Sequence, residues 1–288
     1  MRLFGQKLSI AALVGLAIIV INILAALLAP AIAPYGEADI IGDVWDAPSW
    51  LAKEGEAVDA GDLDAPQTLF GLDNLGRDMF SRLLYGARTT IMIALITTAL
   101  SFTIGCVFGF AAAVAGGWVD MVLSRVVDAL MAIPTLIFAL LVLSVLGTSI
   151  PVLIGTIAVL DSTRVFRLSR AVAMNIVPLE YVEAARLRGE GLAWVMRREV
   201  LPNALPPLIA EFGLRFCFTF LFIAALSFLG LGIQPPFADW GGMVRDNAQA
   251  ISFGGIAPLI PATAIALLTI GVNLVVDWIL SIHAARRA

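Results

Sequence analysis

The sequence contains few of the residues that build metal centres, disulfide frameworks or nucleotide-binding loops. Among its 288 residues there are one histidine, His283, and two cysteines, Cys106 and Cys217, which exclude a multi-histidine metal site and a disulfide framework. The two lysines, Lys7 and Lys53, both lie outside a G-x-x-x-x-G-K-[ST] context, so this chain carries no phosphate-binding loop of its own. Any ATP that its activity consumes must therefore be hydrolysed by another chain.

Charged residues are also scarce. They make up 14% of the chain, against about 25% in soluble domains, while 60% of the residues are apolar and the mean hydropathy is +0.96. A soluble globule of this length would need a more polar surface. The composition therefore argues against a soluble enzyme and predicts an integral membrane protein.

Five stretches without a charged residue, each 23 to 32 residues long, locate the membrane spans, because about 20 residues cross a bilayer. The longest, 129–160, would measure roughly 48 Å as one helix and contains a turn signal at Gly147–Pro151, so it is divided between two helices. We therefore expect an all-α membrane protein with six transmembrane helices, at 9–29, 89–114, 122–146, 151–170, 204–231 and 257–280.

A signal peptide is the alternative for the first span, because basic residues precede it and Ala31-Ile32-Ala33 follows it. Its apolar run of about 22 residues exceeds the 7–15 of a signal peptide, which favours an uncleaved anchor. With the N-terminus inside, twelve of the eighteen lysines and arginines fall in cytoplasmic segments, so both termini should be cytoplasmic. The expected order is an N-terminal anchor (1–30), a periplasmic loop (31–88), a transmembrane core (89–282) that includes a cytoplasmic loop (171–203), and a cytoplasmic tail (283–288).

The first loop is strongly acidic. Between Ala33 and Tyr85 it carries eleven acidic and three basic residues, and its middle, 53–66, is rich in glycine and alanine. Such a segment is typical of a solvated loop, and a docking surface for an extracytoplasmic partner is the alternative. The composition favours the first interpretation.

The strongest local signal lies between the fourth and fifth predicted spans, where Pro178 can open a helix and Gly189 can end it in a left-handed conformation. One face of this helix would carry residues spaced i, i+3, i+4 and i+7: Tyr181, Ala184, Ala185 and Arg188. The two small alanines would let another surface approach closely. A second short helix should follow, with one side made of Leu192, Val195, Met196 and Glu199. Pro202 would then restart the chain into the fifth span, which leaves two short amphipathic helices at the membrane surface.

This loop resembles the EAA motif of bacterial ABC importer permeases. That pattern is Glu-Ala-Ala, three residues, Gly, nine residues, a hydrophobic residue, one further residue and Leu-Pro. Glu183-Ala184-Ala185, Gly189 and Leu201-Pro202 stand at the family spacing, whereas Glu199 occupies the position where a hydrophobic residue is usual. An ordinary interfacial amphipathic helix is the alternative interpretation.

Further segments resemble the C-type subunit of the dipeptide, oligopeptide and nickel permeases and extend the similarity over most of the chain. Residues 70–88 are similar to the pattern GTDxxGRDxxSRxxYGAR before the second span, and 226–241 to the pattern LSFLGLGxQPP…WG at the end of the fifth. Asn273 and Asp277 match an Asn-x-x-x-Asp pair of the sixth span. The chain departs from the family at Ile223, where glutamate is frequent, and at its end, 283–288.

The resemblance implies the type I ABC importer permease fold, in a bacterial inner-membrane subunit that is not itself an enzyme and binds no cofactor, metal or nucleic acid. It implies a homologous second permease, two ATPase subunits that bind ATP and Mg, and a periplasmic substrate-binding protein. ATP-driven closure of the ATPases would move the loop helices and rock the spans between inward-open and outward-open states. The residues that would couple to an ATPase are Tyr181, Glu183, Ala184, Ala185, Arg186, Gly189, Leu201 and Pro202.

Cargo in the resembling family is most often a short peptide, and nickel, glutathione and opine-like compounds also occur. The spans offer no histidine-rich path for nickel, which favours peptides or other small organic solutes. Candidates for a gate or substrate path are the charged and polar residues in or near the spans: Asp161, Arg164, Glu211, Arg215, Ser227, Asn273 and Asp277. Structural pairing is the alternative, since Asp161 and Arg164 stand three residues apart and Glu211 and Arg215 four.

Three local features complete the expectations. Gly105 and Gly109 form a G-x-x-x-G pattern that suits close helix packing. Pro134 is expected to kink or start a span. The tryptophans near predicted interfaces, where an aromatic belt would place them, are Trp118, Trp240 and Trp278.

Two other functions compete with a subunit that couples to external ATPases. An autonomous secondary transporter or channel would need a complete pathway in one chain, often with internal repeats, and no repeat is visible. An intramembrane enzyme would need a nucleophile with a base, or metal ligands, within the spans. The single histidine near the end of the chain argues against it.

Overall fold

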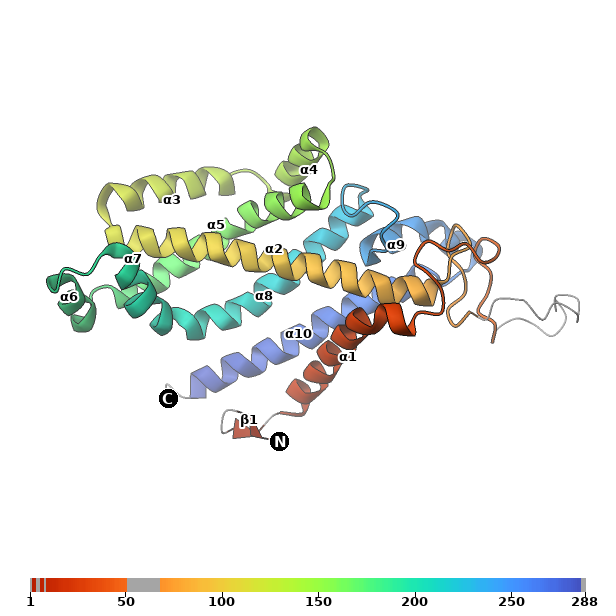
Figure 1. Ribbon diagram of the computed structural model, residues 1–288, viewed down its shortest axis with the longest axis horizontal. Helices are drawn as coiled ribbons and strands as arrows, with labels where there is room; N and C mark the ends of the chain where they lie inside the picture. Colours follow the sequence, from red (N-terminus) through yellow and green to blue (C-terminus); the bar gives the residue numbers. More distant parts are fainter. Residues whose placement is uncertain (1, 4–5, 8, 51–67, 286–288) are drawn as a thin grey trace, which may run out of the picture. The chain divides into compact units, whose positions relative to one another are not determined.

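The computed structural model describes residues 2–3, 6–7, 9–50 and 68–285. Within them the regular structure is helical apart from two isolated bridges and two paired strands, β1 (Arg2–Leu3) and β2 (Gln6–Lys7). The chain forms two compact units, Met1–Ile93 with Phe220–Val275 and Ala94–Thr219 with Val276–Ala288. Three helices contribute residues to both units: α2 (Met79–Ala115), α8 (Leu201–Phe228) and α10 (Leu259–Ala285) (Figure 1).

In the first unit, α1 (Ile10–Ile32) lies beside α10 (Figure 1). The Ser9 side chain caps α1 by accepting a hydrogen bond of 3.1 Å from the backbone nitrogen of Ala12. A Cβ atom on Gly15 would lie only 2.6 Å from the carbonyl oxygen of Gly271, so the two helices meet backbone to backbone at these glycines. The helices α9 (Trp240–Asp246) and η2 (Ala248–Phe253), a 3-10 helix, belong to the same unit.

In the second unit, α2 crosses α5 (Ile150–Ile176) at a pair of glycines. A Cβ atom on Gly105 would lie 2.5 Å from the Cβ of Val165, and one on Gly109 would overlap the hydroxyl of Ser169. The Ser169 hydroxyl also donates a hydrogen bond of 2.9 Å to the carbonyl oxygen of Gly105. The close helix packing predicted from the G-x-x-x-G pattern is confirmed.

The span predicted at 122–146 is not one continuous helix. The structure has two helices there, α3 (Gly117–Met131) and α4 (Thr135–Leu146), which bend by 85° at the break between them. Pro134 stands at this break, where its ring and missing N–H prevent a helix from continuing, as its position in the sequence predicts.

Four helices of the described residues are long and apolar enough to cross a membrane, and a fifth span is added if the bent pair α3–α4 counts as one. The 27-residue α5 is not among them because it carries Asp161, Arg164, Arg167 and Arg170. The protein is thus a multi-pass membrane protein, and six spans are compatible with the structure but remain a prediction. The helix predicted to start at 89 begins ten residues earlier, at Met79. The prediction used the start of a stretch without charged residues, but a helix can begin before such a stretch.

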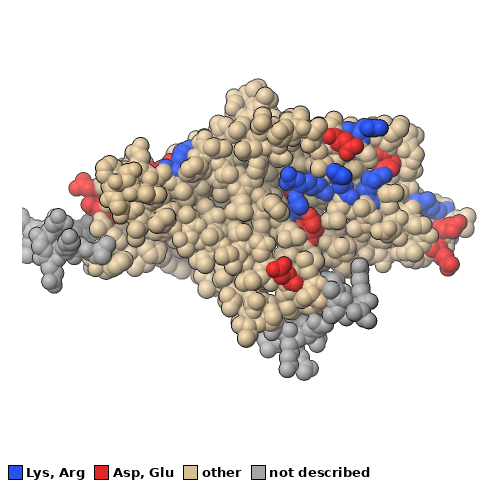
Figure 2. All heavy atoms as spheres, turned by 180° about the vertical axis from the view of Figure 1, so that it is seen from behind, with Lys and Arg blue, Asp and Glu red and all other residues tan. Residues whose placement is uncertain are grey.

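The first apolar helix, α1, has most of its side chains facing outward within this chain. In α1 only 17% of the most apolar stretch is buried, and Ile10, Val20 and Leu27 are exposed. Figure 2 shows broad areas of the surface without acidic or basic side chains, between smaller patches where charges gather. Such a surface suits contact with lipid or with other membrane chains.

Candidate functional site

The loop helix that carries the Glu-Ala-Ala sequence is α6 (Glu180–Leu187). It ends at Gly189, whose φ of +85° is left-handed and whose backbone nitrogen donates to the carbonyl oxygen of Arg186 at 2.9 Å. The next backbone nitrogen, of Glu190, donates to the carbonyl oxygen of Ala185 at 3.2 Å. This pair of hydrogen bonds is a Schellman motif, so the predicted role of Gly189 as helix terminator is confirmed.

One side of α6 is anchored in a small apolar core, here called the loop core. The buried residues of the loop core are Phe110, Val114, Ala173, Ile176, Val182, Val195, Val200, Ala204 and Leu208. Ala185, with an exposed fraction of 0%, lies on the same inward side of α6 as Val182. The outward side carries the exposed residues Tyr181, Glu183, Ala184, Arg186 and Arg188. The prediction that Ala184 and Ala185 both face a partner is therefore wrong for Ala185, because the three-residue step from Val182 brings it inward.

Arg186 connects α6 to the end of α2. Its guanidinium donates a hydrogen bond of 2.8 Å to the carbonyl oxygen of Val114, in the last turn of α2. The last carbonyls of a helix lack partners within the helix and carry partial negative charge, so an arginine is well placed there. This contact gives Arg186 a structural role in addition to the predicted one.

The second predicted loop helix does not end before the fifth span. The helix α7 (Leu192–Val195) continues through a π-helical segment, η1 (Met196–Val200), directly into α8. The restart predicted at Pro202 is wrong, because this proline falls in the first turn of α8, where the wide π-helical turn precedes it and its missing N–H is tolerated. Leu201 packs against the loop core and Pro202 is exposed.

Four of the candidate path residues form one charged network in the second unit. Arg215 Nε donates to Glu211 Oε1 at 2.6 Å, and Nη1 of the same guanidinium lies 3.7 Å from Asp161 Oδ1. Arg164 Nη1 lies 3.8 Å from the same Asp161 oxygen, and Ser101 donates its hydroxyl to Asp161 Oδ2 at 3.1 Å. Both predicted ion pairs are present, and Ser101 is a partner that the sequence did not reveal. The network joins α2, α5 and α8 and neutralises charge within the bundle.

The other three candidates are not brought together. Ser227 is buried in the last turn of α8, and its hydroxyl accepts a hydrogen bond of 3.2 Å from the backbone nitrogen of Ile233, in the turn that follows. The Asn273 amide donates to the carbonyl oxygen of Thr269 on its own helix at 3.0 Å. Asp277 is exposed and makes no ion pair with any residue that the structure describes.

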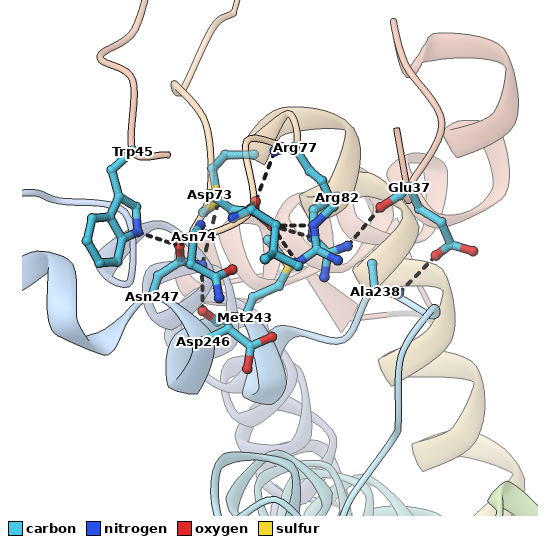
Figure 3. A network of polar contacts seen from close by, with 12 residues as sticks. Glu37, Trp45, Asp73, Asn74, Arg77, Arg82, Ala238, Met243, Asp246 and Asn247 are labelled. Carbon is cyan, nitrogen blue, oxygen red and sulfur yellow. Dashed lines mark hydrogen bonds and ion pairs between the residues drawn. The ribbon is translucent and has the colours of Figure 1, made fainter. Parts of the chain in front are cut away.

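A polar network in the first unit holds the end of the long first loop (Figure 3). Asp73 accepts from Arg77 Nε at 2.7 Å and lies 3.2 Å from Arg82 Nε. Arg82 donates to the carbonyl oxygen of Glu37 at 2.7 Å, and the Glu37 carboxylate accepts from the backbone nitrogen of Ala238 at 2.9 Å. Because the side chains of Asp73, Arg77 and Arg82 are buried and paired, this part of the loop is folded structure. The acidic middle of the loop, 53–66, lies outside the described residues.

Asn247 is a second hub of the same network (Figure 3). Its Oδ1 accepts from the backbone nitrogen of Asn74 at 3.0 Å and from the Trp45 indole at 3.2 Å, and its amide donates to the carbonyl oxygen of Met243 at 2.9 Å. It thereby joins segments that are 173 and 202 positions away in sequence. In the sequence, the only indication of these contacts was that residues 70–88 resemble a permease segment.

Trp240 is buried with an exposed fraction of 1%, so its predicted place in an aromatic belt is wrong. A Cβ atom on Gly86 would lie 2.8 Å from Cδ1 of this indole, and Phe220 meets it edge to face at 6.0 Å between ring centroids. The indole nitrogen donates to the carbonyl oxygen of Leu83 at 2.9 Å. A tryptophan with an apolar ring and a satisfied N–H is as stable in a core as at an interface, which the sequence alone does not distinguish.

Asp239 caps α9 beside this tryptophan. Its Oδ2 accepts from the backbone nitrogen of Gly242 at 2.7 Å, and its Oδ1 accepts from the Thr90 hydroxyl at 3.1 Å. Burial raises the pKa of Asp239 above the usual aspartate range, and hydrogen bonds from Gly242, Ser227 and Thr90 oppose part of that rise.

Taken together, the apolar helices, the charged network among them and the capped loop helix describe a helical, membrane-embedded protein. A family model described as "Binding-protein-dependent transport system inner membrane component" matches residues 101–288, and the chain belongs to this family. This match and the peptide permeases among its relatives confirm the resemblance to ABC importer permeases of the peptide family.

Named relatives support the same family. The di/tripeptide transport system permease protein DppC of Pseudomonas aeruginosa is 34% identical over 267 residues, covering 92% of this chain and 85% of the relative. The dipeptide transport system permease protein DppC of Escherichia coli is 36% identical over 267 residues, with coverages of 92% and 86%. The glutathione transport system permease protein GsiD of Pectobacterium atrosepticum is 30% identical over 207 residues, with coverages of 72% and 69%.

A solved structure shows the same fold. It is a crystal structure of an amino acid ABC transporter with histidines, 20% identical to this chain at a TM-score of 0.51. The match covers 68% of this chain and 92% of that chain. The expected all-α permease fold is therefore confirmed.

Proposed function

We propose that this chain is a membrane-spanning permease subunit of an ATP-driven importer that translocates short peptides or related small solutes. The names of its relatives support this cargo, since they are permeases for dipeptides, tripeptides and glutathione. We place the chain in a bacterial inner membrane with six spans and with both termini in the cytoplasm. The subunit itself carries out no hydrolysis and binds no cofactor.

Four other chains complete the proposed transporter. They are a homologous second permease, two ATPase subunits that bind ATP and Mg, and a periplasmic protein that delivers the substrate. The two permeases form the pathway together. The C-type resemblance of residues 70–88 and 226–241 supports a partner permease of the other type.

The exposed face of α6 carries the coupling proposal. Tyr181, Glu183 and Ala184 face outward on a helix whose other side is held by the loop core and whose end is fixed at Gly189. Because Arg186 and the loop core tie α6 to α2, α5 and α8, a displacement of α6 by an ATPase would move these helices with it. Such coupling requires ATP and substrate to differ in affinity for the two states of the transporter.

Co-purification tests the proposed function. The chain is tagged in its native host, extracted in mild detergent, and its stoichiometric partners are identified by mass spectrometry. We expect a second permease and P-loop ATPases, and ATP-dependent uptake of a dipeptide by vesicles that contain the assembly and its binding protein. Recovery of this chain alone, with transport that needs no ATP, would replace the proposal by a secondary transporter.

A further inference from the structure

A polar pocket lies between α3 and α5 in the second unit. Its volume is about 400 Å³, within the range of about 300–1,000 Å³ that small-molecule sites occupy. The side chains that line it with polar atoms are Ser124, Asp128, Arg167 and Arg170, and Phe166 adds an apolar wall. None of them belongs to the loop core or to the charged network around Asp161.

The two arginines of this pocket differ in their partners. Arg170 is held by Asp120, to which its Nη2 donates at 2.6 Å and its Nε donates as well, so its charge is used within the chain. Arg167 is exposed, and the single hydrogen bond it makes among the described residues is one of 3.9 Å to the Met131 sulfur. A thioether is a weak acceptor, so the Arg167 guanidinium keeps its donors free.

Asp128 supplies the opposite charge to Arg167 in this pocket. It is exposed on the α3 side of the pocket, and it makes no ion pair within the part of the chain that the structure describes. The pocket therefore presents a cation from α5 and an anion from α3 that form no ion pair with any described residue, although Asp128 lies near enough to Arg170 for the two charges to interact. Figure 2 shows basic and acidic side chains gathered beside one another on the surface in view.

Unpaired charges on helices of a membrane protein are costly, and they face water-filled cavities or the solutes that pass through them. The planar guanidinium of arginine binds a carboxylate through two parallel hydrogen bonds. A carboxylate such as that of Asp128 accepts hydrogen bonds from an ammonium group. A solute with both termini charged would satisfy both side chains at once.

We propose that the pocket between α3 and α5 binds a zwitterionic solute of the size of a dipeptide, with its carboxylate on Arg167 and its ammonium group on Asp128. The inference rests on the proposed function, because it assigns part of the cargo's route to this pocket. It adds a recognition site on the permease itself for the two charged ends of a peptide.

Binding to the assembled transporter tests this inference without the periplasmic protein. The purified assembly in detergent is titrated with dialanine, with N-acetylalanine, which lacks the ammonium group, and with alaninamide, which lacks the carboxylate. We expect dialanine to bind most tightly. We expect Arg167→Gln to weaken its binding about tenfold or more, which corresponds to a lost charge-assisted hydrogen bond.

Three further variants separate charge from folding. Arg167→Lys keeps the positive charge and should retain part of the affinity, and Asp128→Asn should abolish the preference for dialanine over N-acetylalanine. Arg125→Gln is the matched control, since Arg125 is an exposed arginine on the same α3 that does not line the pocket. Each variant is first checked for its assembled size by gel filtration.

Unchanged dialanine binding by Arg167→Gln and Asp128→Asn would overturn the inference, and so would equal binding of all three probes. A tightly held anionic phospholipid that native mass spectrometry finds in the wild type and loses in Arg167→Gln would also overturn it. ATP-dependent uptake of dialanine is measured in parallel. If the wild type takes up dialanine while the pocket variants bind it normally, the proposed function stands and the pocket assignment alone fails.

Discussion

The guanidinium of Arg186 in α6 donates a hydrogen bond of 2.8 Å to the carbonyl oxygen of Val114, at the end of α2. Val114 is also part of the loop core, in which Val182 of α6 is buried. The loop helix and the end of α2 are therefore joined by one polar and one apolar contact. Both contacts would have to move as a unit if α6 were displaced.

Replacing Arg186 by alanine should weaken this connection. A hydrogen bond from a charged donor contributes about 1.5–3 kcal/mol when buried, and exposure of this side chain reduces that to about 1 kcal/mol, or roughly fivefold. We expect Arg186→Ala to lower ATP-driven uptake by about that factor without changing the amount of protein in the membrane. The measurement is the initial uptake rate in vesicles, normalised to protein.

Arg198→Ala is the control for Arg186→Ala, because Arg198 is exposed in the same loop and makes no ion pair with the described residues. It should leave the rate nearly unchanged. Equal losses in both variants would mean that positive charge in the loop matters and the contact with Val114 does not.

Gly189 offers a graded test of the loop helix. Its φ of +85° costs a residue with a side chain roughly 1–2 kcal/mol, but nothing lies within 4 Å of a Cβ added there. Gly189→Ala should therefore reduce uptake only several-fold. Gly189→Pro imposes a φ near −65° and removes the N–H that bonds Arg186, so it should abolish uptake while membrane insertion persists.

The uptake rate and the membrane level of each glycine variant are measured to test the coupling role of α6. If Gly189→Pro transports normally at normal expression, α6 does not couple the ATPases to the spans. Identical losses in the two variants would indicate that the left-handed backbone, and not the hydrogen bond to Arg186, is the critical feature.

Features that depend on neighbouring residues were predictable from the sequence. The G-x-x-x-G of α2, the break at Pro134 and the stop at Gly189 each follow from the backbone properties of one or two residue types. The pairs Asp161–Arg164 and Glu211–Arg215 follow from helical spacing. These are the cases in which local chemistry and the fold agree.

Features that depend on distant residues were not predictable. The contact of Asn247 with Asn74 joins residues 173 positions apart, and no local pattern indicates it. Trp240 is of a residue type that is common at membrane interfaces, yet it is buried in a core where Gly86 leaves room for its ring. The inward position of Ala185 likewise depends on where the loop core lies, which a helical periodicity cannot specify by itself.

The crossing of α2 and α5 predicts opposite effects for two glycines. A Cβ on Gly105 would lie 2.5 Å from the Cβ of the β-branched and therefore stiff Val165, so Gly105→Ala should destabilise the protein by about 1–3 kcal/mol. Gly155 lies within α5 with nothing within 4 Å of an added Cβ, and Gly155→Ala should stabilise by about 0.5–1 kcal/mol. Thermal unfolding in detergent should show a lower midpoint for the first variant and a higher one for the second, and a shift of the same sign in both would contradict the close crossing.

Asp239 predicts a pH dependence of stability. Because burial raises its pKa in the folded protein, the folded state holds the proton more tightly than the unfolded chain does, whose aspartate titrates near pH 4. The free energy of unfolding therefore falls as the pH rises from about 4 toward the raised pKa, by up to about 1.4 kcal/mol per pH unit. Above the raised pKa the loss is complete and the dependence ends.

Asp239→Asn should remove this dependence while it keeps the cap of α9, because asparagine accepts the hydrogen bond from Gly242 as well as aspartate does. The stability of the wild type relative to the variant should therefore decrease as the pH rises from 4.5 to 8. Thermal unfolding of both proteins in detergent across this range measures the difference, in which the titration of all other groups cancels. Parallel curves would mean that Asp239 titrates alike in the folded and unfolded chains, and that its contacts with Thr90 and Gly242 offset its burial in full.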